Sequence, residues 1–438
     1  MADVNAGRKV ARGYAIWGLL NLVAGGPALG LLAAYDATSD GGLSIKYPIF
    51  GTHSWLVMMG WCVPLTFAIV FWLLPILKDT PVRYGSVYTL CLSALIAPTF
   101  GLAAYLALAH LGRPAIFVLA PSWACYLAAA ILYTVIVWRV CARTLRPTAS
   151  DIGLSSGAVW LLAILALKLV IALGAAATSR DDFAAQSERA LLIAMMLGFV
   201  VNTGLALAAA IGPEFLAMGH ARPTVVTAFR LYNTCVALWC GGATYLLPYP
   251  FGLGRFALTL VSIALLYSIT RLLIELRMFE MLLLRANSAR RKLTRTALGT
   301  AAVMLVLAGG VIMALTLWMA ATVTWAPDEL VTLTMHLICV GFFPCIIMGL
   351  FVPLLGNRSL NGVKLPLAYA AYAFLLAWLL GRTAVAVVVL MNGQPMWFER
   401  YVLGLLAGAG AVCLALWMLL ALLSPNRPAP LSPPPPAA

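Results

Sequence analysis

The sequence has 438 residues, of which 63% are hydrophobic and only 10% are charged, and its formal net charge is +14. A soluble globular domain is about half apolar and about a quarter charged, so this composition excludes a soluble domain and indicates a polytopic membrane protein. The positive charge does not indicate nucleic-acid binding, because no basic segment with interleaved aromatic residues is present.

Twelve runs are long and apolar enough to cross a membrane, which takes about 20 mostly apolar residues. Alternating segments typical of a transmembrane β-barrel are absent, so we predict an all-α protein with twelve transmembrane helices. The predicted helices cover residues 13–35, 53–77, 84–110, 121–143, 154–177, 190–217, 225–247, 256–279, 296–325, 330–354, 365–391 and 399–423.

Positive charge is distributed unevenly between the two ends of these predicted helices. If Arg8, Lys9 and Arg12 are cytoplasmic, the basic segment 285–295 and Arg427 are cytoplasmic as well. This asymmetry follows the positive-inside rule and predicts that both termini are cytoplasmic. We therefore expect a multi-pass protein of the bacterial inner membrane. The basic segment either touches anionic lipid or docks a partner.

The predicted helices form one transmembrane domain over residues 1–423, and no soluble domain remains to be assigned. Residues 424–438 form a proline-rich tail that we predict to be disordered. The nine cysteines are irregularly spaced in apolar runs, so we interpret them as small buried hydrophobic residues, not as disulfides or a metal cage. No Cys-x-x-Cys-His motif occurs, which excludes a covalently attached c-type heme on this chain.

A short sequence pattern recurs at intervals of about 140 residues, which indicates an internal repeat. A glycine followed by an aromatic residue occurs at 60–61, 198–199 and 341–342, and a proline follows each pair within the same predicted helix. Each site lies four predicted helices after the previous one. The pattern therefore predicts three pseudo-symmetric four-helix units.

Two of the four histidines, His53 and His336, lie at or just inside the outer ends of two predicted helices that both run inward. An ionisable side chain within a span is costly and marks a functional site by default. Two imidazoles would fill both axial positions of a heme iron and suit it to electron transfer. Alternatively, each is an interfacial histidine bonded to a backbone carbonyl. We expect His110 and His220 to be in contact with water.

The stretches "THSWLVMMGWCVPLTFAIVFWLLPIL" (52–77) and "TMHLICVGF" (334–342) resemble helices 2 and 10 of the heme–copper oxidase catalytic subunit family. That family includes cytochrome oxidase subunit I and the nitric oxide reductases. Its helix 2 histidine and the second histidine of a helix 10 His-x-His bind a low-spin heme. The resemblance implies that His53 and His336 are this pair, and that they bind the iron of one non-covalent heme b.

The family's ligands for copper and for a high-spin heme are missing from this sequence. Thr334 replaces the first helix 10 histidine, and a residue near Ile193 occupies the helix 6 copper-ligand position. Ala243 and Thr244 stand where helix 7 should carry a histidine pair. Copper is therefore not expected at that site. The chain looks like a divergent member that keeps the low-spin heme and has no catalytic residue of its own.

Two arginines are candidates to accompany the heme. Arg400 is placed to pair with a heme propionate, as arginines of that loop do in the family, or is an ordinary interfacial arginine. Arg382 either meets a propionate or extends toward the outer interface, and Lys168 is also expected to extend toward an interface. Acidic residues are nearly all in loops, with Glu214 at a helix end, which argues against a proton pump.

Together these features predict an electron-transfer subunit of a respiratory-type complex. Its donor would be quinol or a periplasmic cytochrome c, and its partners would be other membrane or periplasmic redox subunits, because one heme near one face cannot carry electrons across the membrane alone. Two alternatives stay open. One is a terminal oxidase or nitric oxide reductase subunit of the heme–copper type, and the other is a heme-free scaffold, transporter or assembly factor on the same fold.

Overall fold

A computed structural model describes most of the chain. The described residues are 4–28, 53–77, 85–110, 116–141, 147–178, 185–216, 219–246, 252–284, 286–322, 328–354, 364–392 and 397–423. The proline-rich tail predicted to be disordered, residues 424–438, lies outside them.

The described residues form helices and no strand, which confirms the predicted all-α class. The α-helices are α1 (Val4–Val23), α4 (Val63–Leu77), α5 (Gly85–His110), α6 (Leu119–Cys141), α7 (Ala149–Thr178), α8 (Ala185–Ala194), α9 (Asn202–Leu216), α10 (Val225–Leu246), α11 (Gly252–Glu275), α12 (Glu280–Leu283), α13 (Ala289–Thr322), α14 (Asp328–His336), α15 (Phe343–Leu354), α16 (Lys364–Asn392) and α17 (Trp397–Leu423). The remaining helical segments are the π-helices η1 (Ala24–Ala28), η2 (Val57–Cys62), η4 (Met195–Val201) and η5 (Leu337–Phe342), and a 3-10 turn, η3 (Ile116–Val118).

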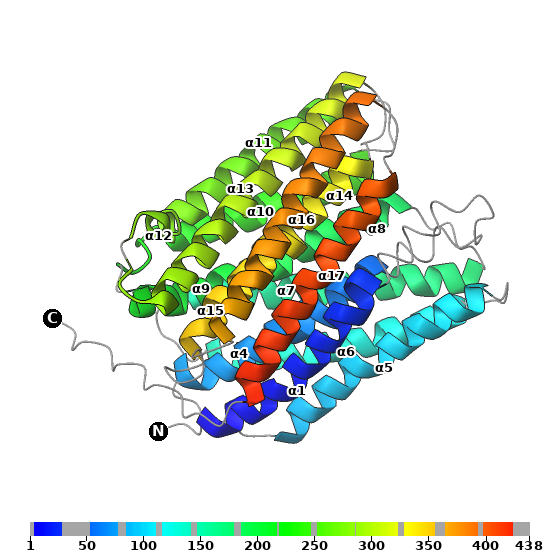
Figure 1. Cartoon of the computed structure of the whole chain (residues 1–438). Coiled ribbons are helices and arrows are strands. Elements are labelled where there is room, and N and C mark those ends of the chain that lie inside the picture. Colours follow the sequence, from blue (N-terminus) through cyan, green and yellow to red (C-terminus); the bar gives the residue numbers. More distant parts are fainter. Residues whose placement is uncertain are drawn as a thin grey trace.

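Ten helices of the described part are long and apolar enough to cross a membrane, so the protein is a multi-pass membrane protein. The two other predicted spans correspond to α1 and α10. Each packs along a neighbour, α1 against α4 and α10 against α11 (Figure 1). The number of twelve crossings stays a prediction.

Three helices form the centre of the bundle. In the spans His53–Pro75, Arg189–Pro213 and Leu330–Pro353, the share of buried residues is 94%, 100% and 83%. In each of the other seven spans it is 50% or less, because one face of those helices looks outward. The central helices therefore touch protein on nearly all sides, and they are the same three that carry the repeated glycine–aromatic pair.

Each central helix contains a π-helix at the repeated sequence site. The pairs 60–61, 198–199 and 341–342 lie within η2, η4 and η5, and a proline follows inside α4, α9 and α15. A π-helix adds a residue to one turn and is frequent at functional sites. The three sites thus share a backbone conformation as well as a sequence pattern, as expected of a repeat.

The repeated glycines allow neighbouring helices to approach closely. A Cβ atom added to Gly198 would lie 2.5 Å from the Trp160 ring of α7. One added to Gly60 would lie 2.9 Å from the Asn21 side chain of α1, and one added to Gly341 would lie 3.0 Å from a methionine of α13. Small residues at such contacts are typical of helix packing in membranes.

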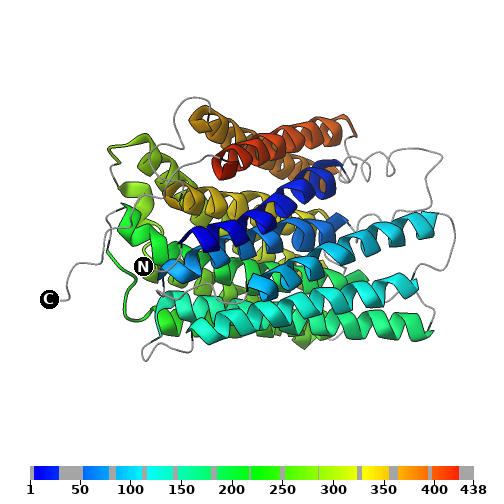
Figure 2. The same cartoon turned by 90° about the horizontal axis from the view of Figure 1, so that it is seen from below.

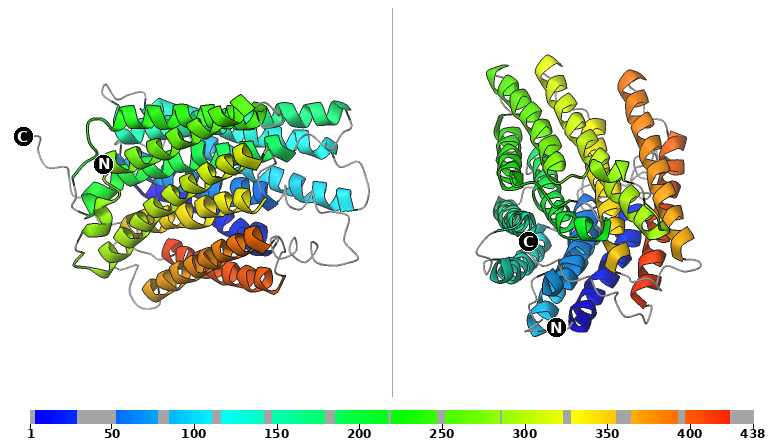
Figure 3. Two further views of the ribbon diagram at one scale, coloured as in Figure 1. Left: turned by 90° about the horizontal axis from the view of Figure 1, so that it is seen from above. Right: turned by 90° about the vertical axis from the view of Figure 1, so that its left-hand side faces the viewer.

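The first and last helices lie side by side (Figures 2 and 3). Near the start of α1, the Arg8 guanidinium donates a hydrogen bond to the Leu422 carbonyl near the end of α17, at 3.4 Å. The start of α1 and the end of α17 therefore lie at the same end of the bundle.

Replacing Gly198 by Ala will destabilise the protein. The new methyl group would meet the rigid Trp160 ring at 2.5 Å, and overpacking of this kind costs about 1–3 kcal/mol. We expect a lower thermal unfolding temperature for the purified variant in detergent.

The control is Gly310→Ala in α13, where an added Cβ meets nothing within 4 Å. This variant should be as stable as the parent or more stable by up to about 1 kcal/mol, because Ala favours the helix over Gly. Equal unfolding temperatures for the two variants would contradict the close approach at Gly198.

Candidate functional site

The two predicted heme ligands occupy matching places on two central helices. His53 begins the described part of the second span, and His336 is the last residue of α14, directly before η5. His53 precedes Gly60 by seven residues, and His336 precedes Gly341 by five. The two positions differ by two residues, which is about 3 Å along a helix.

His53 is held in one orientation by the backbone of the first helix. Its Nδ1 atom lies 2.9 Å from the carbonyl oxygen of Gly25, within η1. A carbonyl oxygen only accepts hydrogen bonds, so Nδ1 carries the hydrogen and, in the neutral imidazole, Nε2 carries a lone pair. A metal-binding histidine has this arrangement, because its second nitrogen donates to a carbonyl and fixes the ring. The alternative, a histidine bonded to a backbone carbonyl without a metal, has the same bond.

His336 packs edge to face against an aromatic side chain. Its ring centroid lies 4.7 Å from that of Trp378 in α16, with an interplanar angle of 89°. Its Nδ1 atom is buried and has no hydrogen-bond partner. The ring is within electrostatic range of both Arg382 and His53. The buried Nδ1 atom of His336 is therefore available for a further bond. His53, the other predicted ligand, is one of the electrostatic neighbours of this ring.

Both imidazoles border accessible space although their helices are central. His53 and His336 are half-buried, whereas Trp55 and Leu337 on the same helices are buried. Next to Gly25, a Cβ atom added to Gly26 would meet no atom within 4 Å. Space is thus open next to Gly26, in the segment whose Gly25 carbonyl bonds His53.

The two candidate arginines have different outcomes. Arg382 is half-buried in α16, four residues after Trp378, and its charge reaches His336. The two alternatives for Arg382, a contact with a propionate or an extension toward the outer interface, both stay predictions. Arg400 belongs to α17, and its side chain lies outside the described residues, as does that of His110. His220 is exposed, as expected.

The positions that lack family ligands are filled by packing residues. Thr334 is fully buried, and its hydroxyl donates to the Leu330 carbonyl of its own helix at 2.9 Å. Ile193 and Ala243 are each 3% exposed, and the Thr244 side chain lies outside the described residues. In the part of the chain that is described, no group of three or more His, Cys, Asp or Glu side chains is placed to hold a metal ion.

Lys168 does not extend toward an interface, and that prediction is wrong. Its side chain is 4% exposed within α7. The ammonium group lies over the rings of Trp55 at 5.1 Å and Trp123 at 5.2 Å, and these two rings contact each other edge to face. Aromatic faces attract a cation, and this attraction is stronger when water is excluded. The two indoles therefore contribute to stabilising the charge inside the bundle.

A buried network of amide side chains joins helices α7, α9 and α10. The Asn202 and Asn233 side chains exchange hydrogen bonds of 3.0 and 3.1 Å, and the Trp160 indole donates to the Asn233 oxygen at 2.7 Å. We did not predict this network. Two asparagines inside long apolar runs were the available signal, because polar side chains within spans seek partners on neighbouring helices.

No protein-family model matches the sequence, and no curated protein matches it.

Replacing Asn233 by Ala will destabilise the protein. The change leaves the Trp160 indole and part of the Asn202 amide without a partner. Leaving a buried polar group unsatisfied costs about 1–3 kcal/mol, so we expect a lower thermal unfolding temperature.

The matched control is the neighbouring exposed residue, in the variant Thr234→Ala. The Thr234 hydroxyl donates only to the Arg230 carbonyl of its own helix. This variant should change stability by no more than about 0.5 kcal/mol. An Asn233→Ala protein as stable as Thr234→Ala would show that the amide network does not hold these helices together.

Proposed function

We propose that this chain is a membrane subunit that transfers electrons through one heme b, held between His53 and His336. The observation that carries the proposal is the bond from His53 Nδ1 to the Gly25 carbonyl, which leaves Nε2 free to bind iron. His336 supports it from the facing helix, because it lies at nearly the same depth and its buried Nδ1 lacks a partner.

The residues around the pair fit a planar, negatively charged group. Gly25 fixes the ring of His53, and Trp378 limits the rotation of the His336 ring. Arg382 supplies a positive charge on the same side, suited to the carboxylates of a heme, and Arg400 is a second candidate for that role. A bis-histidine heme would exchange single electrons and leave no open iron position for a gas.

The chain has no intact oxygen-reducing site in this proposal. The hydroxyl of Thr334 is already bonded within its helix, and Ile193 and Ala243 offer no metal ligand. A terminal oxidase or nitric oxide reductase would need such ligands. We therefore assign no catalytic residue to this chain. Quinol or cytochrome c would be the donor, and partner subunits would carry further redox centres.

We further propose twelve crossings in three pseudo-symmetric four-helix units, with both termini cytoplasmic in a bacterial inner membrane. The shared π-helices η2, η4 and η5 support the three units. The Arg8–Leu422 hydrogen bond supports an even number of crossings, because it joins the first and last helices at one end. The basic residues near the start of α1 support the cytoplasmic assignment of that end. The membership in the heme–copper oxidase family is part of the same proposal.

The decisive experiment is the reduced-minus-oxidised visible spectrum of the purified protein with and without carbon monoxide. We expect a sharp low-spin b-type band that carbon monoxide does not move. His53→Ala and His336→Ala should each lose the band, because either change removes an axial ligand. His220→Ala, at an exposed position, is the control and should keep the band.

The other outcomes exclude the proposal in different ways. A band that shifts with carbon monoxide would mean an open iron and would favour the oxidase or nitric oxide reductase alternative. A protein that folds normally without heme would favour the scaffold, transporter or assembly alternative.

A further inference from the structure

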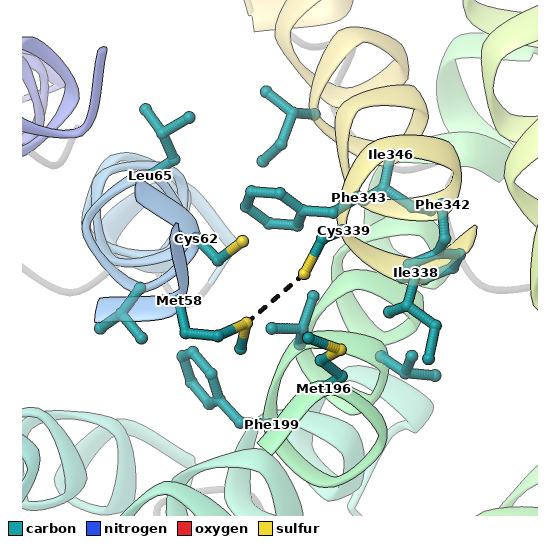
Figure 4. Packing of buried hydrophobic residues seen from close by; sticks show 14 of the residues in the cluster. Met58, Cys62, Leu65, Met196, Phe199, Ile338, Cys339, Phe342, Phe343 and Ile346 are labelled. Carbon is teal, nitrogen blue, oxygen red and sulfur yellow. Dashed lines mark hydrogen bonds between the residues drawn. The ribbon is translucent and has the colours of Figure 1, made fainter. Parts of the chain in front are cut away.

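Three sulfur atoms from two helices meet in the centre of the bundle (Figure 4). The Cys339 Sγ atom of η5 lies 3.5 Å from the Met58 Sδ atom of η2. Cys62, the last residue of η2, points its sulfur atom toward the same Cys339 thiol (Figure 4). Met58 and Cys62 are fully buried, and Cys339 is 3% exposed. Cys339 is therefore the shared member of a compact sulfur cluster.

The π-helices account for this convergence. Met58 is the second residue of η2 and Cys62 is the last, four residues later, so both face the same side of the helix. Cys339 is the third residue of η5, on the central helix that faces them. Figure 4 also shows the thioether of Met196, from η4, beside the three sulfur atoms. The cluster thus lies where the three π-helices approach one another.

We propose that Met58, Cys62 and Cys339 form a binding site for one Cu(I) ion. Soft thiolate and thioether sulfur atoms favour Cu(I), whereas Mg²⁺ and Ca²⁺ require oxygen. Metal–sulfur bonds are about 2.3 Å long, so two sulfur atoms 3.5 Å apart can both reach one ion placed between them. The site contains no histidine and differs from the copper site of heme–copper oxidases in ligands and in helices.

The charge balance suits a buried site. When Cu(I) binds as the protein folds, the S–H bond of Cys339 breaks, its proton passes to water, and a copper–thiolate bond forms. The positive ion and the thiolate then cancel, and the Met58 thioether adds no charge, so little net charge is buried. The Cys62 thiol keeps its proton and completes the site as a neutral third sulfur atom. Copper stays Cu(I) throughout, and no oxidant or reductant is needed.

The proposed site concerns two of the nine cysteines. None of the nine forms a disulfide, and seven are buried, as expected of small hydrophobic residues. Cys62 and Cys339 are among the buried ones, and the Cys339 sulfur also contacts a methionine sulfur. The irregular spacing in the sequence could not reveal this, since 277 residues separate the two cysteines.

The test is the copper content of protein made in copper-supplemented cells and purified without oxygen. Growth with copper matters because the buried sulfur atoms must be loaded as the protein folds. Wild-type protein should retain one copper per chain against a Cu(I) chelator. X-ray absorption at the copper edge should show sulfur neighbours only. Cys339→Ala should lose the copper, and the volume-conserving Met58→Leu should bind about 10-fold more weakly or worse.

The matched control is Cys345→Ala, which removes a buried cysteine of α15 outside the cluster and should retain the copper. Thermal unfolding and gel filtration check that each variant is folded. Equal copper in wild type and Cys339→Ala would overturn the proposal, as would nitrogen neighbours in the absorption spectrum. His53→Ala and His336→Ala should keep the copper, so this proposal and the heme proposal fail independently.

Discussion

The arrangement of this protein depends on three helices that touch protein on almost every side. Helices in a bilayer gain little from hiding apolar surface, because lipid is as apolar as leucine. Close packing and internal hydrogen bonds must therefore hold the central helices. The glycines of η2, η4 and η5 allow the close packing, since each lets a neighbouring side chain come within 3.0 Å of where a Cβ would be. The Asn202–Asn233 pair provides internal hydrogen bonds.

The π-helices change the direction in which side chains of the central helices point. An added residue in one turn rotates everything that follows, so side chains above and below the wide turn point in directions that a regular helix would not give. In the span His53–Pro75, His53 lies before η2 and bonds the Gly25 carbonyl, while Met58 lies within η2 and its sulfur atom contacts Cys339 of η5. The proposed heme site and the proposed copper site can thus use one helix without competing for the same space.

The sequence predicted the parts of the fold that depend on local pattern. Long apolar runs indicated the helices, and the repeated glycine–aromatic pair marked where the π-helices lie, although nothing in the pattern revealed their widened turns. The placement of His53 beside Gly25 required knowing how the first two helices cross. Lys168 was expected at an interface because a single charge in lipid is costly, and only the assembled fold brings the rings of Trp55 and Trp123 together beneath its ammonium group. The sulfur cluster could not be predicted from the sequence either, because it joins residues that are 277 positions apart.

The contact between α1 and α17 has a consequence for biosynthesis. Chain order means that α17 is synthesised after α1, and the Arg8–Leu422 hydrogen bond between them spans 414 positions of sequence. The α17 helix also packs against η1, the segment whose Gly25 carbonyl orients His53. That side of η1 therefore stays uncovered during synthesis until α17 docks. A cofactor that binds beside His53 can therefore enter before α17 docks. The packed α17 helix would then retain it.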